Sequence, residues 1–541
     1  MAIVAPTLLV VLAFGIGEGG KVGWVPRDVL ERPIGLRNDV GHVHEVVTTA
    51  SKDAQSFYDQ GLTLLHSYYW IDAARSFHQA LRLDPALAMA HVGLSYVYSG
   101  LEDDEAARQE LKRAQELRAS LTEREQRRVD IRAKQLEAME DPGSASRLLD
   151  YRGAIEAALA KWPDAAELWI LAGQASEPSP WGRGQRGLAA SIACYEAALA
   201  RSPDHLAAHH YLTHTYETLG YAERALKHGE VYARLAPGVP HAQHMFAHDL
   251  RRVGRIADAI AHFEHTRHLE EEYSRAQQIP PEYDWHYAHN LSLLATGYQY
   301  EGRLAAAAEV LKRLFDLPKF LPRFDLTRRE WIEFLLGRGR TEEALAAARE
   351  MQQAPSPGVR SVARTLSGHA LLALNRVADA QRELAEAERE VAAVVVRGPL
   401  PITPTMLKPY LDTLRGEILL RTGRGEEGVQ LLQQVQGRIR GEPGPDNWIM
   451  ALFRLDAIAR VAREAGHWEL AEYSARQMLE HDESYAGAHY ALALVADHAG
   501  DAETARREFG AAVRLWSSAD PDLPELRDAR ARLAAGTRSA R

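Results

Sequence analysis

The sequence contains a single cysteine among 541 residues, so an internal disulfide is excluded. Cys194 lies in the segment IACYEAAL at a packed helical position, where we expect a small buried hydrophobe rather than a nucleophile. A basic excess is also missing, since the formal net charge is −10. Because Lys and Arg must neutralise phosphates, we expect no nucleic-acid partner.

Motifs for metal-independent catalysis are missing too. The sequence shows no nucleophile placed with a base, no dinucleotide-binding fingerprint and no paired catalytic carboxylates. It also lacks the HExxH signature of zinc proteases. Whether the chain is an enzyme therefore stays open, and any activity would depend on a metal.

Long hydrophobic runs are limited to the first residues, MAIVAPTLLVVLAFGIG. Residues 1–20 are a candidate signal peptide or anchor, although the first lysine is Lys21 and a basic start is lacking. Export to a periplasmic or extracytoplasmic location is favoured, and a cytoplasmic location is the alternative. No later segment has the length and apolarity of a membrane span.

A repeat of 34 residues runs through most of the chain. The unit that starts at Ala54 carries small, aromatic and turn residues at fixed positions, and these are Gly61, Ala73, Phe77, Ala80 and Pro85. Small residues suit the place where two helices cross, and proline ends the second helix. No single unit can bury its own apolar face, so units must stack into a continuous core.

This pattern closely resembles the tetratricopeptide repeat. The resemblance implies an all-α solenoid, a right-handed superhelix of ten to twelve antiparallel helix pairs that covers nearly the whole chain from residue 50. It also implies a concave groove that binds a protein or peptide partner.

The chain is expected to divide into five segments. After residues 1–20 comes an N-terminal extension at 21–50. A first repeat array then covers 51–310, a second covers 311–520, and a tail covers 521–541. Loops rich in Gly and Pro, such as 176–187 and 441–447, are interpreted as insertions within or between repeat units.

Histidines gather in one part of the repeat. Thirteen of the 23 histidines lie between His205 and His289. The pair His210 and His214 returns 34 residues later as His244 and His248. Because a helical repeat places equivalent positions side by side, we expect these four imidazoles to meet on one surface.

The histidines occupy repeat positions 2, 5 and 9, which form one stripe along the first helix of each unit. Imidazole suits zinc, copper and iron, so a transition-metal site is predicted, with haem as an alternative. The alternative to a metal site is a peptide-binding groove in which the histidines serve as polar contacts. The predicted ligands are His210, His214, His241, His244, His248 and His289, with Glu217 and His286 as a second tier.

A narrower resemblance covers residues 40 to about 310. The opening FYDQGLTLLHSYYWIDAARSFHQALRLDPALAMAHVGL is similar to the start of a bacterial, histidine-rich tetratricopeptide family of unsettled activity. The helices AAHHYLTHTYE, VPHAQHMFAHDLRRVGR and WHYAHNLSLLATGYQYEGR resemble its histidine-rich segments. Leu87 departs from this pattern, since the family often has cysteine there. The resemblance implies a fold and a site but not a reaction.

Three functions fit these observations. The first, which we favour, is a solenoid that binds a protein or peptide in its groove and holds a transition metal there. The second is a metal-dependent oxidase or hydrolase on the same architecture. The third is a purely structural component of a larger assembly.

Overall fold

The computed structural model describes residues 25–182, 188–319, 321–396, 401–442 and 446–539. The candidate leader, residues 1–20, lies outside them. The described residues form helices joined by turns and short loops, with no strand among them. Within this part of the chain, none of the helices has both the length and the apolar character that crossing a membrane requires.

Thirteen α-helices occupy the first half of the chain. They are α1 (Arg27–Leu30), α2 (Lys52–His66), α3 (Trp70–Leu83), α4 (Ala88–Gly100), α5 (Asp104–Glu116), α6 (Glu123–Glu140), α7 (Ala145–Lys161), α8 (Ala166–Ala175), α9 (Ala189–Arg201), α10 (Leu206–Thr218), α11 (Ala222–Leu235), α12 (Pro240–Arg252) and α13 (Ile256–Gln277). The 3₁₀ turn η1 (Arg118–Ser120) lies between α5 and α6, and a second one, η2 (Pro281–Tyr283), follows α13.

Fourteen α-helices follow in the rest of the described residues. They are α14 (Trp285–Glu301), α15 (Leu304–Asp316), α16 (Pro322–Asp325), α17 (Arg329–Gly337), α18 (Thr341–Met351), α19 (Pro357–Ala373), α20 (Val377–Ala392), α21 (Pro404–Arg421), α22 (Gly425–Arg440), α23 (Asn447–Glu464), α24 (Trp468–His481), α25 (Ala486–His498), α26 (Ala502–Leu515) and α27 (Pro524–Ser539). The 3₁₀ turn η3 (Leu326–Arg328) precedes α17.

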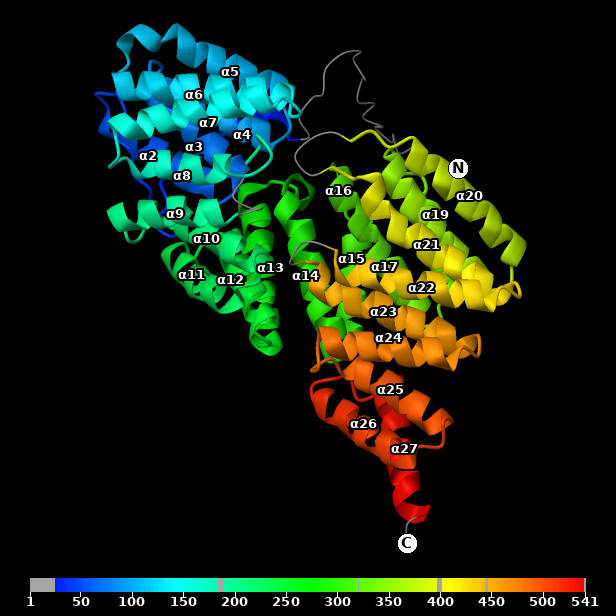
Figure 1. The fold of residues 1–541 in the computed structure, drawn as a ribbon. Helices are drawn as coiled ribbons and strands as arrows, with labels where there is room; N and C mark the ends of the chain where they lie inside the picture. The colour runs from blue at the N-terminus through cyan, green and yellow to red at the C-terminus, as the bar shows by residue number, and fades with distance from the viewer. Residues whose placement is uncertain (1–24, 183–187, 320, 397–400, 443–445, 540–541) are drawn as a thin grey trace, which may run out of the picture.

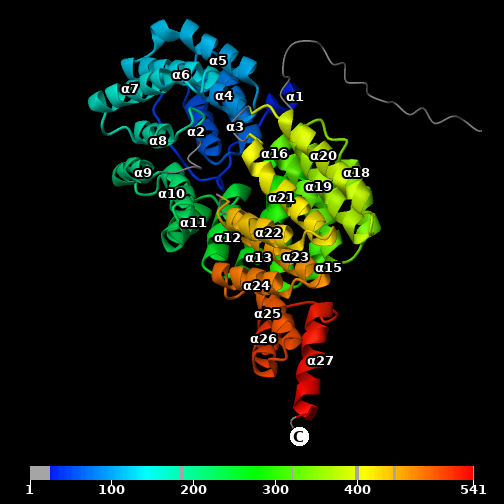
Figure 2. The same cartoon turned by 45° about the vertical axis from the view of Figure 1, so that its right-hand side comes forward.

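Within the described residues these helices form twelve hairpins, and each hairpin packs on the next. The pairs are α2–α3, α4–α5, α6–α7, α8–α9, α10–α11, α12–α13, α14–α15, α17–α18, α19–α20, α21–α22, α23–α24 and α25–α26. The stack is visible as a continuous colour sequence in Figures 1 and 2. The prediction of an all-α solenoid is confirmed. The loop at 176–187 separates α8 from α9, as expected for an insertion within a unit.

Small residues stand where the repeat requires them. A Cβ at Gly61 would lie 2.7 Å from the Phe77 ring, and one at Gly93 would lie 2.4 Å from it. The hairpin turns repeat as well: Gly220 and Gly254, 34 positions apart, have φ of 82° and 79°. Glycine adopts this left-handed conformation without steric cost, so it ends the first helix and starts the turn.

The array curls so that its last units pack against its middle. The Tyr300 hydroxyl donates to Asp482 Oδ2 at 2.7 Å, and the backbone N–H of Ala305 donates to Asp520 Oδ2 at 2.8 Å. One hydrophobic core runs without a break from Ala247 to Val495. It therefore crosses residue 310, where the sequence suggested a division between two arrays.

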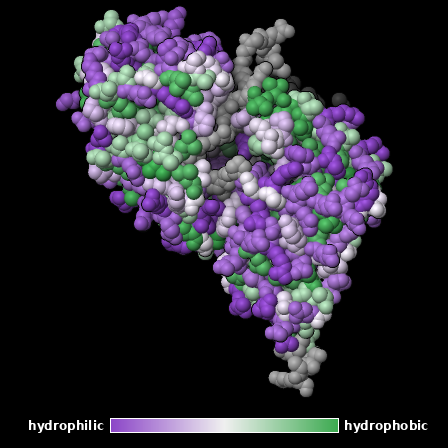
Figure 3. Space-filling view, viewed as in Figure 1, coloured by the Kyte–Doolittle hydropathy of each residue, from purple (hydrophilic) through white to green (hydrophobic). Residues whose placement is uncertain are grey.

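The end of the chain corrects the expectation of a solvated tail at 521–541. Residues 524–539 form α27, and Leu526 and Ala529 are buried against the preceding units. The helix follows Pro524 and places an apolar residue on the core side every third or fourth position. Hydrophilic residues predominate on the outer faces that Figure 3 shows.

The N-terminal extension connects the first helix pair, α2–α3, to the sixth, α12–α13. Its backbone lies alongside α2, where Val40 and Val43 are buried. The backbone N–H of Gly238, before α12, donates to Asp39 O at 2.7 Å. In return, the Arg37 guanidinium donates to Gly238 O at 3.0 Å. The extension therefore holds α2 close to the helices that carry the histidines.

The close approach of paired helices gives a direct test. In α8, a Cβ at Gly173 would lie 2.2 Å from the Tyr195 ring, so Gly173→Ala is expected to destabilise the protein by about 1–3 kcal/mol. In α7, a Cβ at Gly153 would meet nothing within 4 Å, so Gly153→Ala is expected to stabilise by up to about 1 kcal/mol. Urea denaturation followed by circular dichroism measures both. Equal effects of the two substitutions would contradict the packing.

Candidate metal centre

The histidine cluster is built on the first helices of three successive units, α10, α12 and α14. Helix α10 lies against α12, as the 34-residue period requires, and α13 packs on α14. The equivalent positions therefore face the same side of the stack. The structure brings together all of the predicted ligands, but it divides them into two groups rather than one.

The first group, which we call the first triad, consists of His210, His214 and His241. One nitrogen from each ring lies within 4.8 Å of the other two. The closest pair is His210 Nε2 and His241 Nε2, which are 2.9 Å apart. The first triad thus joins two rings from α10 with one from the start of α12.

The second triad consists of His244, His248 and His289, and its ligand nitrogens also lie within 4.8 Å of one another. Here α12 contributes two rings and α14 one. His286 lies between the triads, with its ring centroid 4.9 Å from that of His241 and 4.5 Å from that of His244.

A carboxylate from a distant part of the chain reaches the second triad. Asp446, just before α23, places Oδ1 3.2 Å from His248 Nε2 and Oδ2 3.9 Å from His289 Nε2. The sequence showed this segment only as a Gly- and Pro-rich loop, so Asp446 was missed. Its sole signal was an acidic residue at the end of that loop.

Hydrogen bonds at Nδ1 fix the orientation of four rings. Each Nδ1 lies within hydrogen-bond distance of an oxygen atom, so the ring proton is assigned to Nδ1. The bonds run from His210 to His66 O at 2.6 Å, from His244 to Asn290 Oδ1 at 2.9 Å, from His248 to Glu217 Oε1 at 3.1 Å and from His286 to Glu270 Oε1 at 2.5 Å. In a neutral ring that assignment leaves Nε2 with a lone pair. Glu217, predicted as a second-tier ligand, and Glu270 thus hold histidines instead of occupying a ligand position.

The inward nitrogens lack hydrogen-bond partners. Nε2 of four rings is buried without one: His214, His244, His248 and His286. A buried polar atom without a partner costs free energy, and such groups are few in native proteins. His244, His248 and His286 combine a hydrogen bond at Nδ1 with a free lone pair at Nε2, which is the arrangement that metal-binding histidines generally have.

The spacing of each triad suits a single ion. A tetrahedral ion with bonds to imidazole of about 2.0–2.1 Å holds its nitrogens about 3.3 Å apart. Three nitrogens at the corners of a triangle with 4.8 Å sides need to move inward by less than about 1 Å each to reach that distance. Small changes in side-chain torsion supply such a shift.

Burial favours the neutral form of several of these rings. His210 and His244 are both buried, with 0% of their surface exposed. Burial, with the neighbouring imidazoles adding to it, lowers the pKa of His241 and of His244 well below 6.5. Neutral imidazole is the form that binds metals, so the ligands do not need to lose protons at pH 7.

Aromatic side chains cover the cluster, which is therefore not the open groove surface that the sequence predicted. The Tyr68 ring lies 4.7 Å from that of His210 and 5.2 Å from that of His241. Trp285 lies 6.1 Å from both His241 and His289. A partner protein lying in the groove could not touch most of these imidazoles.

Two further carboxylates, Asp249 and Asp284, lie close to the histidines along the chain. Asp249 faces α11, where a Cβ at Gly229 would lie 2.1 Å from its Oδ2. Burial, with the charge of Glu217 adding to it, raises the pKa of Asp249 well above its ordinary value. Asp284 caps α14 and accepts a hydrogen bond from the backbone N–H of His286 at 3.0 Å.

A family model described as tetratricopeptide repeat matches residues 457–524, from within α23 to the start of α27. This chain carries tetratricopeptide repeats. The same hairpin stacking continues through the described residues on the N-terminal side of that match. Stacked repeats of this kind present extended concave surfaces that bind other macromolecules.

Solved structures with a related outline are distant in sequence. A tetratricopeptide repeat protein from Parabacteroides merdae is 15% identical, and the match covers 53% of this chain and 99% of that chain with a TM-score of 0.35. Human IFIT1, solved as a dimer with PPP-AAAA, is 12% identical, and the match covers 87% of this chain and 96% of that chain with a TM-score of 0.39. No curated protein matches the sequence. The absence of a nucleic-acid partner stays a prediction.

The buried histidines make the protein sensitive to acid. Burial lowers the pKa of His214 and of His289 to about 4, whereas an unfolded chain has a histidine pKa of about 6.5. The unfolded state therefore binds more protons below pH 6.5, and stability is lost as the pH falls from about 6.5 towards 4. Each group contributes up to about 1.4 kcal/mol per pH unit in that window. Urea titrations of chelator-treated protein at several pH values measure this; stability that stays constant from pH 7 to 4.5 would contradict it.

Proposed function

We propose that this protein binds two transition-metal ions, one in each histidine triad, inside its tetratricopeptide array. The observation that carries the proposal is the close packing of three imidazole nitrogens in each triad, together with the buried Nε2 atoms of His214, His244 and His248 that have no hydrogen-bond partner among the described residues. Zinc, copper and iron all accept three imidazoles. The rings pack at 4.8–6.0 Å from one another within and between the triads, which leaves space for single ions but not for a haem.

The two ions would have different surroundings. The first triad supplies three nitrogens and no carboxylate, which leaves one coordination position of a tetrahedral ion open. The second triad has Asp446 beside it as a fourth ligand. Metal ions with a full set of protein ligands generally stabilise structure, whereas ions with an open position generally take part in catalysis.

A metal-dependent enzyme is therefore the second candidate function, and the open position at the first triad favours it. A metal with an exchangeable position can polarise a bound substrate or lower the pKa of a bound water. The protein or peptide partner of the array would bind on another surface, since the imidazoles are covered. A purely structural role fits less well, because it does not explain the unpartnered nitrogens.

Metal content separates the two triads. Untagged protein loaded with zinc and dialysed should retain two equivalents, measured by mass spectrometry of the released metal. His214→Ala should remove one equivalent and His289→Ala the other, because each takes away one of three ligands. His265→Ala, an exposed histidine on α13, serves as the matched control and should leave both. Loss of no metal from either variant, or wild-type protein that retains none, would reject the proposal.

The residues that hydrogen-bond the proposed ligands at Nδ1 allow the metal affinity of each triad to be tested separately. Glu217 accepts from His248 Nδ1, so Glu217→Gln should weaken zinc at the second triad by about 10- to 100-fold. The first triad should keep its affinity, since its anchor is the backbone oxygen of His66. Competition with a chromophoric chelator measures both affinities. An equal loss at both triads would show that Glu217 acts on the fold as a whole.

A further inference from the structure

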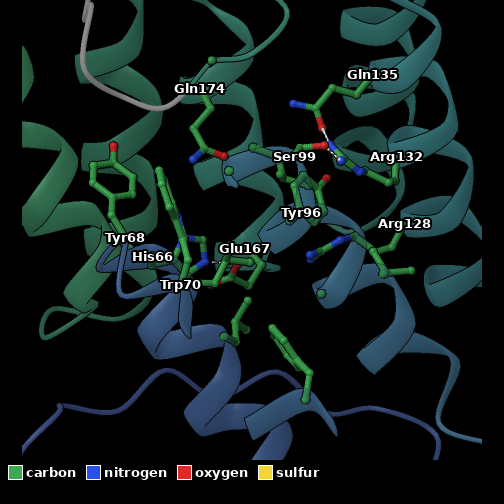
Figure 4. A pocket seen from close by; sticks show the side chains of 18 of the residues that line it. His66, Tyr68, Trp70, Tyr96, Ser99, Arg128, Arg132, Gln135, Glu167 and Gln174 are labelled. Atoms are coloured by element: carbon green, nitrogen blue, oxygen red, sulfur yellow. Dashed lines mark hydrogen bonds and ion pairs between the residues drawn. The ribbon is translucent and has the colours of Figure 1, made fainter. Parts of the chain in front are cut away.

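A cavity separate from the histidine triads lies within the first repeat units. Side chains from α2, α3, α4, α6, α8 and α10 line it, together with the turns that follow α2 and α8. Its volume is about 80 Å³, and it is partly open to solvent. Figure 4 shows Tyr96, Arg128 and Arg132 on one side of it, and Tyr68, His66 and Trp70 on the other.

Arg132 is a buried cation without an anion. Only 1% of its surface is exposed. Its guanidinium donates to Ser95 O at 2.8 Å, to Ser95 Oγ at 2.9 Å, to Gln135 Oε1 at 2.7 Å and to Ser99 Oγ, and it stacks over the Tyr96 ring at 4.1 Å. Every one of these partners is neutral. No carboxylate of the described residues pairs with Arg132, although buried charges in proteins are normally paired.

The other charged side chains that line the cavity have partners of their own. Arg128 donates to Glu45 Oε1 at 2.7 Å. Glu167 lies 3.0 Å from His66 Nε2 and 3.1 Å from His205 Nε2. Among the described residues of this lining, Arg132 is therefore the one charged side chain without a charged or imidazole partner.

Two polar atoms beside Arg132 also lack partners. The Tyr96 hydroxyl and Arg128 Nε are buried without a hydrogen-bond partner among the described residues. Both residues line the cavity, and Arg128 is only 4% exposed. Two unused donors next to an unpaired guanidinium form a site for an anion that accepts several hydrogen bonds.

The rest of the lining is apolar. Trp70, Met89, Val92, Leu171 and Trp181 surround the space away from the arginines. An apolar pocket with a few converging polar groups is typical of small-molecule sites. The ligand should therefore combine one anionic end with an apolar body.

We propose that this cavity binds a small monocarboxylate with an apolar or aromatic body, its carboxylate held by Arg132, Arg128 Nε and the Tyr96 hydroxyl. A carboxylate brings one negative charge to the one cation of the described lining without an ion pair, whereas a phosphate dianion brings two. Four of the five N–H groups of Arg132 donate to Ser95, Ser99 and Gln135, which leaves one N–H for the carboxylate. The site goes beyond the proposed metal binding and does not require a metal.

The cavity nevertheless adjoins the first triad. His66 and Tyr68 line the cavity, and on their other side the His66 carbonyl oxygen anchors His210 while the Tyr68 ring contacts the rings of His210 and His241. The apolar end of a bound carboxylate would lie against this wall. The first triad is thus the nearer of the two to the bound molecule.

Calorimetric titration of chelator-treated protein tests the site without the metal. The probes are butanoate, octanoate, decanoate and 3-phenylpropanoate, with 3-phenylpropanamide as the uncharged match and inorganic phosphate as the competing anion. At least one carboxylate should bind saturably and at least about tenfold more tightly than the amide or phosphate. No saturable binding of any carboxylate, or equal binding of the amide or of phosphate, would overturn the proposal.

Variants assign the binding to these residues. Arg132→Met should weaken the best carboxylate by about tenfold or more, while Arg127→Met, an exposed arginine on the same helix, should have no effect. Because Arg132→Met also removes hydrogen bonds between α6 and α4, Tyr96→Phe is the second variant. It removes a hydroxyl without a partner, so the melting temperature should be unchanged and carboxylate affinity should fall. Unchanged affinity in Tyr96→Phe and in a folded Arg132→Met would overturn the assignment. Metal content is expected to stay at the wild-type value in both, so failure here is distinct from failure of the metal proposal.

Discussion

The 34-residue register of the helix pairs is the constraint on which the rest of the structure depends. It places α10 beside α12, so histidines at equivalent positions of the two helices face the same interior space. Glycines at the crossings, such as Gly61 and Gly93, let the helices approach closely enough for one ring, that of Phe77, to fill the space between them. A shift of register by one residue would turn the imidazoles by about 100° and disperse the cluster.

Burial and hydrogen bonding determine the properties of the imidazoles that this register brings together. Hydrogen bonds at Nδ1 from neighbouring helices fix the rings, and aromatic side chains exclude water from their other nitrogens. The curl of the array then brings Asp446 from the second half of the chain to the second triad. The same closure leaves the first triad without a carboxylate and next to the cavity of Arg132. The two histidine triads therefore have different surroundings within the same fold.

Much of this could be predicted from the sequence, because the repeat and the ligands are local patterns. The period, the crossing residues Gly61 and Phe77, and all six first-tier histidines follow from spacing alone. The division into two triads could not be predicted, since it depends on how the rings of three helices are placed in space and not on their spacing along the sequence. Asp446 was missed because its approach depends on contacts more than 150 residues apart in sequence. Helix α27 was missed because its basic, alanine-rich sequence hides the few apolar residues that dock it.

Anomalous diffraction from crystals of metal-loaded protein tests the central claim most directly. The account predicts two peaks per chain, one within bonding distance of nitrogens of His210, His214 and His241, and one among those of His244, His248 and His289. Peaks elsewhere on the surface, or no peak at either triad after loading with zinc, copper or iron, would contradict it.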